Sequence, residues 1–127
     1  MSTPAAVRQY RVDARSTDVF GRVLCSAREH HFIVDGPVQN GCPGEELTPP
    51  EVFLSAVAAC GVELVHVIAR DEGKTVGKVT LTVHGTVDRG NQKRTDVTVF
   101  NSVRLEFAVS GTDASTAARL VEGFKRR

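Results

Sequence analysis

The chain has 127 residues, with 16 Lys and Arg against 15 Asp and Glu, and 41% of it is hydrophobic. These values are typical of a soluble globular protein. A formal net charge of +1 provides neither the basic stripe of a nucleic-acid-binding protein nor an acidic disordered tail. We therefore expect a single domain over residues 1–127 that binds no nucleic acid, and whose modest core would gain from association with a second copy.

Three cysteines, Cys25, Cys42 and Cys60, are too sparse for the disulfide scaffold of a small secreted protein. The N-terminal residues run directly into a polar segment, without the apolar stretch of a signal peptide. We therefore expect a cytoplasmic protein. The most apolar window, residues 52–69, contains a glutamate and a histidine, so it is interpreted as a buried helix and not as a membrane span.

The first third of the chain alternates apolar and polar residues in the manner of strands. Residues 7–12, 19–25 and 31–34 are rich in β-forming side chains and are separated by polar breaks, which predicts a meander over residues 7–34. Residues 35–48 are rich in glycine and proline and predict a long loop without any regular element. Long loops in compact domains often carry function.

A helix start is clearly marked after this loop. Thr48 can cap the helix, Pro50 suits its first turn, and Glu51 can reach back to complete a capping box. The following residues are apolar on nearly all sides until Gly73 provides a stop. We predict a central helix over residues 49–71 that is wrapped by the rest of the protein.

The last third predicts a β-hairpin and a second helix. Apolar alternation over residues 76–110 indicates two long strands joined by a polar turn at residues 88–91. Thr112 or Asp113 can then cap a helix over residues 113–127. Neither an internal repeat nor a low-complexity tract is present.

Cys60 is the residue of greatest chemical interest, because it lies within the predicted central helix among small neighbours. Most buried cysteines are merely packed hydrophobic residues, so position alone leaves both interpretations open. A nucleophilic Cys60 needs a cation, and the helix start is about three turns away, too far for the dipole to act. Arg28 is the first candidate and Arg22 the second, since a guanidinium stays charged and binds thiolate and carboxylate together. From spacing alone, Arg28 and Arg22 can each equally well be an ordinary solvated arginine on a strand.

Glu51 and Cys42 each have two interpretations. Glu51 either caps the helix or holds an arginine in place, and it precedes Cys60 by nine residues, so an intervening arginine would have to bridge the two. Cys42, on the glycine-rich loop, could attack oxidised Cys60 as a resolving thiol, or it is incidental. The histidines are scattered and no phosphate-loop motif occurs, which predicts neither a metal nor a cofactor.

Several segments, in their order along the chain, resemble the OsmC/Ohr family, the osmotically induced protein C and organic hydroperoxide resistance group. One is Ala-Arg-Glu-His-His-Phe-Ile-Val-Asp-Gly-Pro at residues 27–37. The second, at residues 47–60, is Leu-Thr-Pro-Pro-Glu-Val-Phe-Leu-Ser-Ala-Val-Ala-Ala-Cys, and its Pro-Glu to Ala-Ala-Cys part is fairly specific to the family. Gly-Thr-Asp-Ala-Ser-Thr at residues 111–116 extends the resemblance over nearly the whole chain.

The resemblance implies an α+β, OsmC-like fold in which antiparallel sheets wrap around two helices and two chains intertwine as a homodimer. It implies a thiol peroxidase that reduces organic hydroperoxides to alcohols in oxidative-stress defence. It implies no membrane as a partner. Cys60 matches the peroxidatic cysteine, and Arg28 and Glu51 match the arginine and glutamate that activate it. A lipoyl-type or other dithiol is the implied reductant.

The chain departs from the family pattern at its C-terminal end. The family's resolving cysteine and closing strand would both follow Arg127, so we expect this sequence to lack them. Either the sequence is a shortened form of a longer protein, which the uncapped last helix favours, or Cys42, an external thiol or nothing resolves Cys60. The second case favours the alternative function, a non-catalytic redox sensor or small-molecule-binding dimer.

Overall fold

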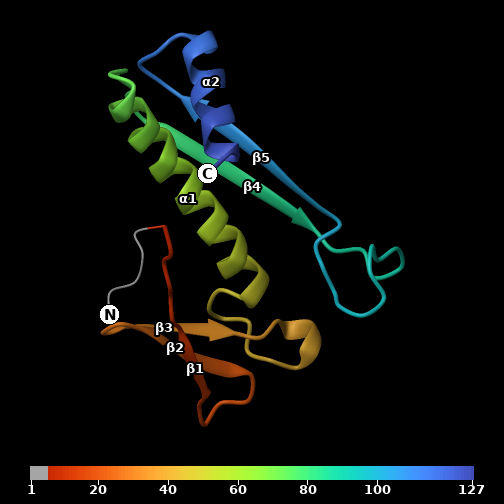
Figure 1. The fold of residues 1–127 in the computed structure, drawn as a ribbon. Helices are drawn as coiled ribbons and strands as arrows, with labels where there is room; N and C mark the ends of the chain where they lie inside the picture. The colour runs from red at the N-terminus through yellow and green to blue at the C-terminus, as the bar shows by residue number, and fades with distance from the viewer. Residues whose placement is uncertain (1–5) are drawn as a thin grey trace. The chain divides into compact units, whose positions relative to one another are not determined.

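The computed structural model describes residues 6–127, which form two α-helices and five strands in two antiparallel sheets (Figure 1). The structure is therefore an α+β fold, as expected. The chain divides into two compact units. Unit 1 ends at Val52 and unit 2 comprises Phe53–Arg127.

Unit 1 contains a three-stranded sheet in the order β1 (Asp13–Ser16), β2 (Arg22–Ala27) and β3 (His30–Asp35). In the β1–β2 turn, the N–H and hydroxyl of Thr17 both donate to the carbonyl of Arg22, at 3.2 and 3.0 Å. Only two residues join β2 to β3. The strands thus follow one another as a meander.

The first strand is not where the sequence pattern predicts it. Residues 7–12 form no regular structure, and the strand begins at Asp13. The register gives the reason: Asp13 pairs with Ser26, so β2 ends only one residue later, at Ala27. Residues before position 12 have strand-forming side chains, but β2 offers them no backbone to pair with. The prediction of a strand at residues 19–25 starts too early as well, because residues 19–21 belong to the turn.

The predicted loop is present over residues 36–48, with one difference. A short 3-10 helix, η1 (Val38–Asn40), lies within it and ends at Gly41, whose φ is 77°. The expectation of no regular element is wrong here, because Pro37 supplies the extended residue before the turn and Gly41 the left-handed residue after it. Asp35 belongs to β3 and not to the loop.

Helix α1 spans Pro49–Asp71, the predicted bounds. The N–H and hydroxyl of Thr48 donate to Oε1 of Glu51 at 2.9 and 2.7 Å, so Glu51 does reach back over the first turn. The helix stops at Gly73, which has a φ of 66° and donates to the carbonyl of Arg70 at 3.1 Å. Both ends follow from local sequence.

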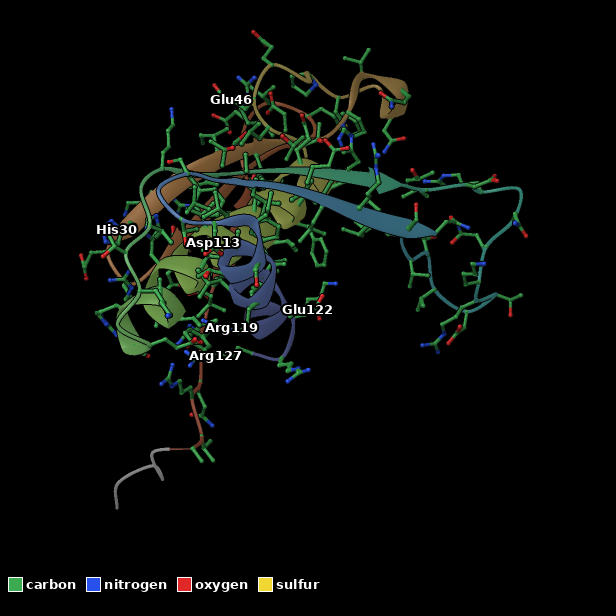
Figure 2. All side chains as sticks on the ribbon, turned by 90° about the horizontal axis from the view of Figure 1, so that it is seen from above. His30, Glu46, Asp113, Arg119, Glu122 and Arg127 are labelled. Carbon is green, nitrogen blue, oxygen red and sulfur yellow. The ribbon has the colours of Figure 1, made fainter. Side chains whose placement is uncertain are left out.

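Unit 2 packs a β-hairpin with both helices. Strand β4 (Val79–Thr86) pairs antiparallel with β5 (Ser102–Val109), and α2 (Ala114–Lys125) follows. Asp113 caps α2 by accepting the N–H of Thr116 at 2.7 Å; Figure 2 labels this aspartate, with Arg119 and Glu122 further along the helix. The core draws on α1, β4 and α2 and consists of Val65, Ile68, Ala69, Val79 and Leu120.

The connection between β4 and β5 is longer than predicted. It spans residues 87–101, whereas the pattern placed a turn at residues 88–91 and the second strand from residue 97. Side-chain amides form hydrogen bonds with backbone groups that would otherwise pair between the two strands. Gln92 donates to the carbonyl of Asp88 at 2.8 Å and accepts the N–H of Val99 at 3.3 Å.

Within unit 2, the hairpin and α2 cover only part of α1. Its buried residues are Gly61, Val65, Ile68 and Ala69, and only 22% of its most apolar window is buried. By length and composition the helix could cross a membrane, but core helices of soluble proteins pass the same test. Within unit 2, a large apolar area of α1 is therefore left uncovered.

Gly61 determines which side of α1 meets the hairpin. A Cβ at this position would lie 2.5 Å from Cδ2 of Leu81 and 3.1 Å from Cζ of Phe107.

We predict that Gly61→Ala destabilises the protein by about 1–3 kcal/mol through overpacking, although alanine favours helix by about 1 kcal/mol. Urea unfolding followed by circular dichroism measures the change. Gly90→Ala, at an open loop position, is the control, and a Gly61→Ala variant as stable as the parent would contradict the close packing.

Candidate functional site

The predicted site residues divide between the two units. Cys60 belongs to unit 2, whereas Arg22, Arg28, Cys42 and Glu51 belong to unit 1. Within the described part of the chain, neither unit alone holds both the thiol and its candidate cations.

Cys60 is exposed on α1. The exposed helix positions on its side are Ala56, Ala59 and Glu63, and with Cys60 they form what we call the Cys60 face. The two alanines leave the sulfur open to a reactant, while the adjacent Gly61 is buried toward the hairpin. Within unit 2, Cys60 is therefore not a packed core residue.

Arg22 is held by a buried carboxylate. Its Nε and Nη2 donate to the two oxygens of Asp35, each at 2.8 Å, and Nη2 also donates to Glu45 at 3.2 Å. Asp35 is 0% exposed and also accepts the N–H groups of Glu45 and Glu46 at 3.0 Å. We call Arg22, Asp35, Glu45 and Glu46 the Asp35 clamp. A bidentate guanidinium–carboxylate pair is a strong and geometrically specific contact.

The clamp keeps both charges fixed. Hydrogen bonds from Arg22 and from the backbone of Glu46 and Glu45 hold the pKa of Asp35 well below its usual range, against the opposing effect of burial. Asp35 in turn raises the pKa of Arg22. Arg22 is therefore committed to unit 1, which makes it a weaker candidate than Arg28 for contacting a thiolate.

The sequence reasoning did not find the Asp35 clamp. Asp35 ends β3 directly opposite Arg22 at the start of β2, so the two form a cross-strand pair. An arginine within one predicted strand and an acid directly after the next one were the available signal. The contribution of residues 45 and 46 depends on the path of the loop and left no pattern in the sequence.

Arg28 lies at the first position of the two-residue β2–β3 turn with a φ of 57°, the left-handed region. This conformation costs a residue other than glycine about 1–2 kcal/mol. The side chain lines a groove of about 740 Å³ with Ala27 and residues 9–13, and it makes no ion pair within residues 6–127. Strained residues are often found at functional sites, so the strain and the unused charge both favour Arg28.

Cys42 is packed and only half-exposed. A Cβ on either Gly21 or Gly36 would collide with its sulfur, so the thiol occupies the space that two glycines leave. Its N–H donates to the carbonyl of Pro37 at 3.3 Å. Its thiol is thus packed within unit 1, and its role as a resolving thiol stays a prediction.

Glu51 has a defined local role. The two hydrogen bonds from Thr48 lower the pKa of its carboxyl group, so it is ionised at neutral pH. Its predicted second role, holding an arginine, remains a prediction.

Among residues 6–127 there is no cluster of three or more His, Cys, Asp or Glu side chains that could hold a metal ion.

Comparison with known families gives a match over α1, the hairpin and α2. The sequence profile described as OsmC-like protein matches residues 42–127, a segment that includes Cys60. The chain belongs to the OsmC family. No curated protein matches this OsmC-like protein significantly in sequence.

Solved structures of low sequence identity share the fold of this OsmC-like protein. An OsmC-like protein from Mycoplasma pneumoniae superposes with a TM-score of 0.80 at 15% identity, covering 94% of this chain and 82% of that one. Some of the other solved structures are named organic hydroperoxide resistance proteins. The one from Legionella pneumophila has a TM-score of 0.70 at 18% identity (94% and 84% covered). The one from Elizabethkingia anophelis has 0.71 at 16% (99% and 85% covered).

The clamp predicts a defined acid sensitivity. Because the pKa of Asp35 is lowered in the folded state, its carboxylate stabilises the fold above its ordinary pKa of 3.8, and this contribution is lost progressively as the pH falls below it. We predict that Asp35→Asn lowers the stability at pH 7 and flattens the decline of stability below about pH 4. Urea unfolding at a series of pH values measures both.

Glu45→Gln, which removes the exposed carboxylate on Arg22, is the matched control and should have a smaller effect at pH 7. Parallel pH profiles for Asp35→Asn and the parent would show that the clamp does not govern acid stability.

Proposed function

We propose that this OsmC-like protein is a thiol peroxidase that reduces organic hydroperoxides to alcohols through Cys60, and that both units are parts of one OsmC-like domain. The observation that carries the proposal is the exposed thiol on the small-residue face of α1, within the segment that matches the family. The relatives named organic hydroperoxide resistance proteins support the same chemistry.

The reaction has two balanced stages. The Cys60 thiolate attacks the distal oxygen of the hydroperoxide; an S–O bond forms, the O–O bond breaks, and the alcohol leaves after taking up a proton. The first thiol of a dithiol reductant then attacks the sulfenic sulfur of Cys60, which releases water and forms a mixed disulfide. The second thiol of an external dithiol, lipoyl-type or other, breaks this disulfide and restores Cys60. The free cysteines suit the reducing cytoplasm.

Arg28 is the proposed activating cation. The thiolate needs a positive charge, and α1 supplies none at Cys60, because the helix start is too far away. Of the two candidates, Arg22 is held by Asp35, whereas Arg28 lines an open groove. Glu51, ionised at neutral pH, is the carboxylate proposed to orient the arginine.

An organic substrate fits the N-terminal side of the Cys60 face. Ala56 lies one turn before Cys60, and Phe53 lies two turns before it on the same stripe of α1. Phe53 is 58% exposed and stacks on Phe100, with ring centroids 5.7 Å apart. An apolar surface of this kind favours a bulky hydroperoxide over hydrogen peroxide.

Removal of the thiol provides the direct test. Cys60→Ser should reduce the rate of cumene hydroperoxide consumption, measured with a dithiol in excess, to that of a reaction without protein. The parent should consume hydrogen peroxide more slowly than cumene hydroperoxide. Arg28→Lys should lower the rate with both peroxides, because an ammonium group cannot hold thiolate and carboxylate together.

Cys25→Ser is the control for loss of a thiol, and Arg15→Lys, on a neighbouring strand, is the control for the arginine. Full activity in Cys60→Ser would exclude the proposed mechanism. Full activity in Arg28→Lys would exclude only the assignment of the cation.

We propose a homodimer as the working form. The uncovered apolar area of α1 needs a partner surface, and a second copy supplies a matching helix. Light scattering at micromolar concentration should give twice the 13.7 kDa of one chain. A monomer at that concentration would contradict this part of the proposal.

A redox sensor or small-molecule-binding dimer is the second candidate function. The packing of Cys42 against Gly21 and Gly36 favours it, because a resolving thiol that is held in place slows turnover. Repeated turnover with a dithiol supports the peroxidase, whereas oxidation of Cys60 that stops after one equivalent of hydroperoxide supports the sensor.

A further inference from the structure

Glu63 places a negative charge one helical turn beyond Cys60. Residues three apart on a helix are surface neighbours, and both of these residues are exposed on the Cys60 face. The side chains on the opposite side of Cys60 along this face are apolar, beginning with Ala56. The face therefore has one apolar end and one acidic end.

The charge of Glu63 is not neutralised by its neighbours on α1. None of the ion pairs within residues 6–127 involves Glu63. The next cation along the helix is Arg70, which is paired with Asp71 at 3.1 Å. His66 is the nearest titratable group on that side. An anion that approaches the sulfur from this end of the face meets an uncompensated carboxylate.

We propose that Glu63 is a specificity-determining residue that makes the Cys60 site select neutral over anionic hydroperoxides. The inference rests on the proposed function and names the substrate class within it. Like-charge repulsion rejects one class of reactant without strengthening the binding of the other, which is a common way to obtain specificity. Arg28 has a different task, because it stabilises the thiolate, whichever hydroperoxide arrives.

The size of the effect follows from Coulomb's law. Two unit charges about 7 Å apart in water repel each other enough to change a rate about threefold, and more where a partner surface excludes water. Salt weakens the repulsion between exposed charges, because the Debye length falls to about 3 Å at 1 M ionic strength. A charge filter thus has two measurable marks, its dependence on reagent charge and its dependence on salt.

Alkylation of Cys60 tests the filter without requiring turnover. Iodoacetamide is neutral and iodoacetate is anionic, and otherwise the two reagents are similar. In Glu63→Gln, the ratio of the iodoacetate rate to the iodoacetamide rate at Cys60 should rise about threefold over the parent. Peptide mass spectrometry assigns the modification to Cys60. Salt at about 1 M should make the rate ratios of the parent and of Glu63→Gln nearly equal.

Two variants serve as controls. Glu63→Asp keeps the charge and should keep the parent ratio. Glu72→Gln removes one negative charge just after the end of α1, where Glu72 pairs with Arg119 at 3.3 Å, about 18 Å along the helix axis from Cys60, and should also leave the ratio unchanged. An unchanged ratio in Glu63→Gln, or an equal rise in Glu72→Gln, would overturn the proposal.

A matched pair of peroxides extends the test to the reaction. A hydroperoxide that carries a carboxylate a few bonds from its O–O group and its methyl ester differ in one charge near the reacting oxygen, and Glu63→Gln should raise the rate for the acid relative to the ester. An unchanged acid-to-ester ratio would overturn the proposal as well. If neither peroxide reacts with any variant, the proposed peroxidase function fails, and the alkylation ratio alone decides whether Glu63 acts as a charge filter.

Discussion

The buried carboxylate of Asp35 is the interaction on which unit 1 depends. It joins the start of β2 to the end of β3 through Arg22, and it fixes the returning loop through the N–H groups of residues 45 and 46. The N–H of Asp35 itself donates to the carbonyl of Leu47 at 3.0 Å. Because Thr48 follows at once and its carbonyl accepts the N–H of Val52 in the first turn of α1, the clamp also fixes the chain at the point where the long helix begins. A single buried charge with all its partners thus connects three segments that the sequence separates.

The second constraint is the unequal character of α1 around its circumference. Gly61 allows Leu81 and Phe107 to approach the helix backbone, and Val65 and Ile68 continue the same buried side. This packing leaves Cys60 on the other side, among alanines. A reactive thiol in the middle of a helix needs such an arrangement, since a residue with a larger side chain in place of Ala56 or Ala59 would cover the sulfur. The packing of the core and the accessibility of the thiol therefore have one cause.

The two helices could be predicted from the sequence because their ends are encoded locally. Glu51 accepts the N–H of Thr48 at the start of α1, and Asp113 accepts the N–H of Thr116 in the first turn of α2, as the pattern indicates. The strands were harder to predict than the helices, because an alternating segment such as residues 7–12 becomes a strand only where another strand lies opposite and can pair with it. In residues 87–101, amide side chains replace the ladder, and no alternation of apolar residues reveals that.

The candidate site shows the same division. Cys60 could be found because its helix is so clearly marked, and the family resemblance supplied its expected role. That Arg22 is held by Asp35, and that Arg28 is strained, depends on strand register and on a backbone angle, neither of which a single sequence displays. The sequence could therefore name both arginines, and the contacts of each were needed to rank them.

The strand pairing has a consequence for how the protein is made. Every strand pair in residues 6–127 joins two consecutive strands, β1 with β2, β2 with β3, and β4 with β5. Contacts between near neighbours in sequence form quickly, so each sheet can assemble as soon as its own strands have left the ribosome. The apolar side of α1 that unit 2 leaves uncovered is then exposed to solvent while the two sheets are already folded. The period of greatest risk of aggregation thus comes late, and it ends only when the helix finds its cover.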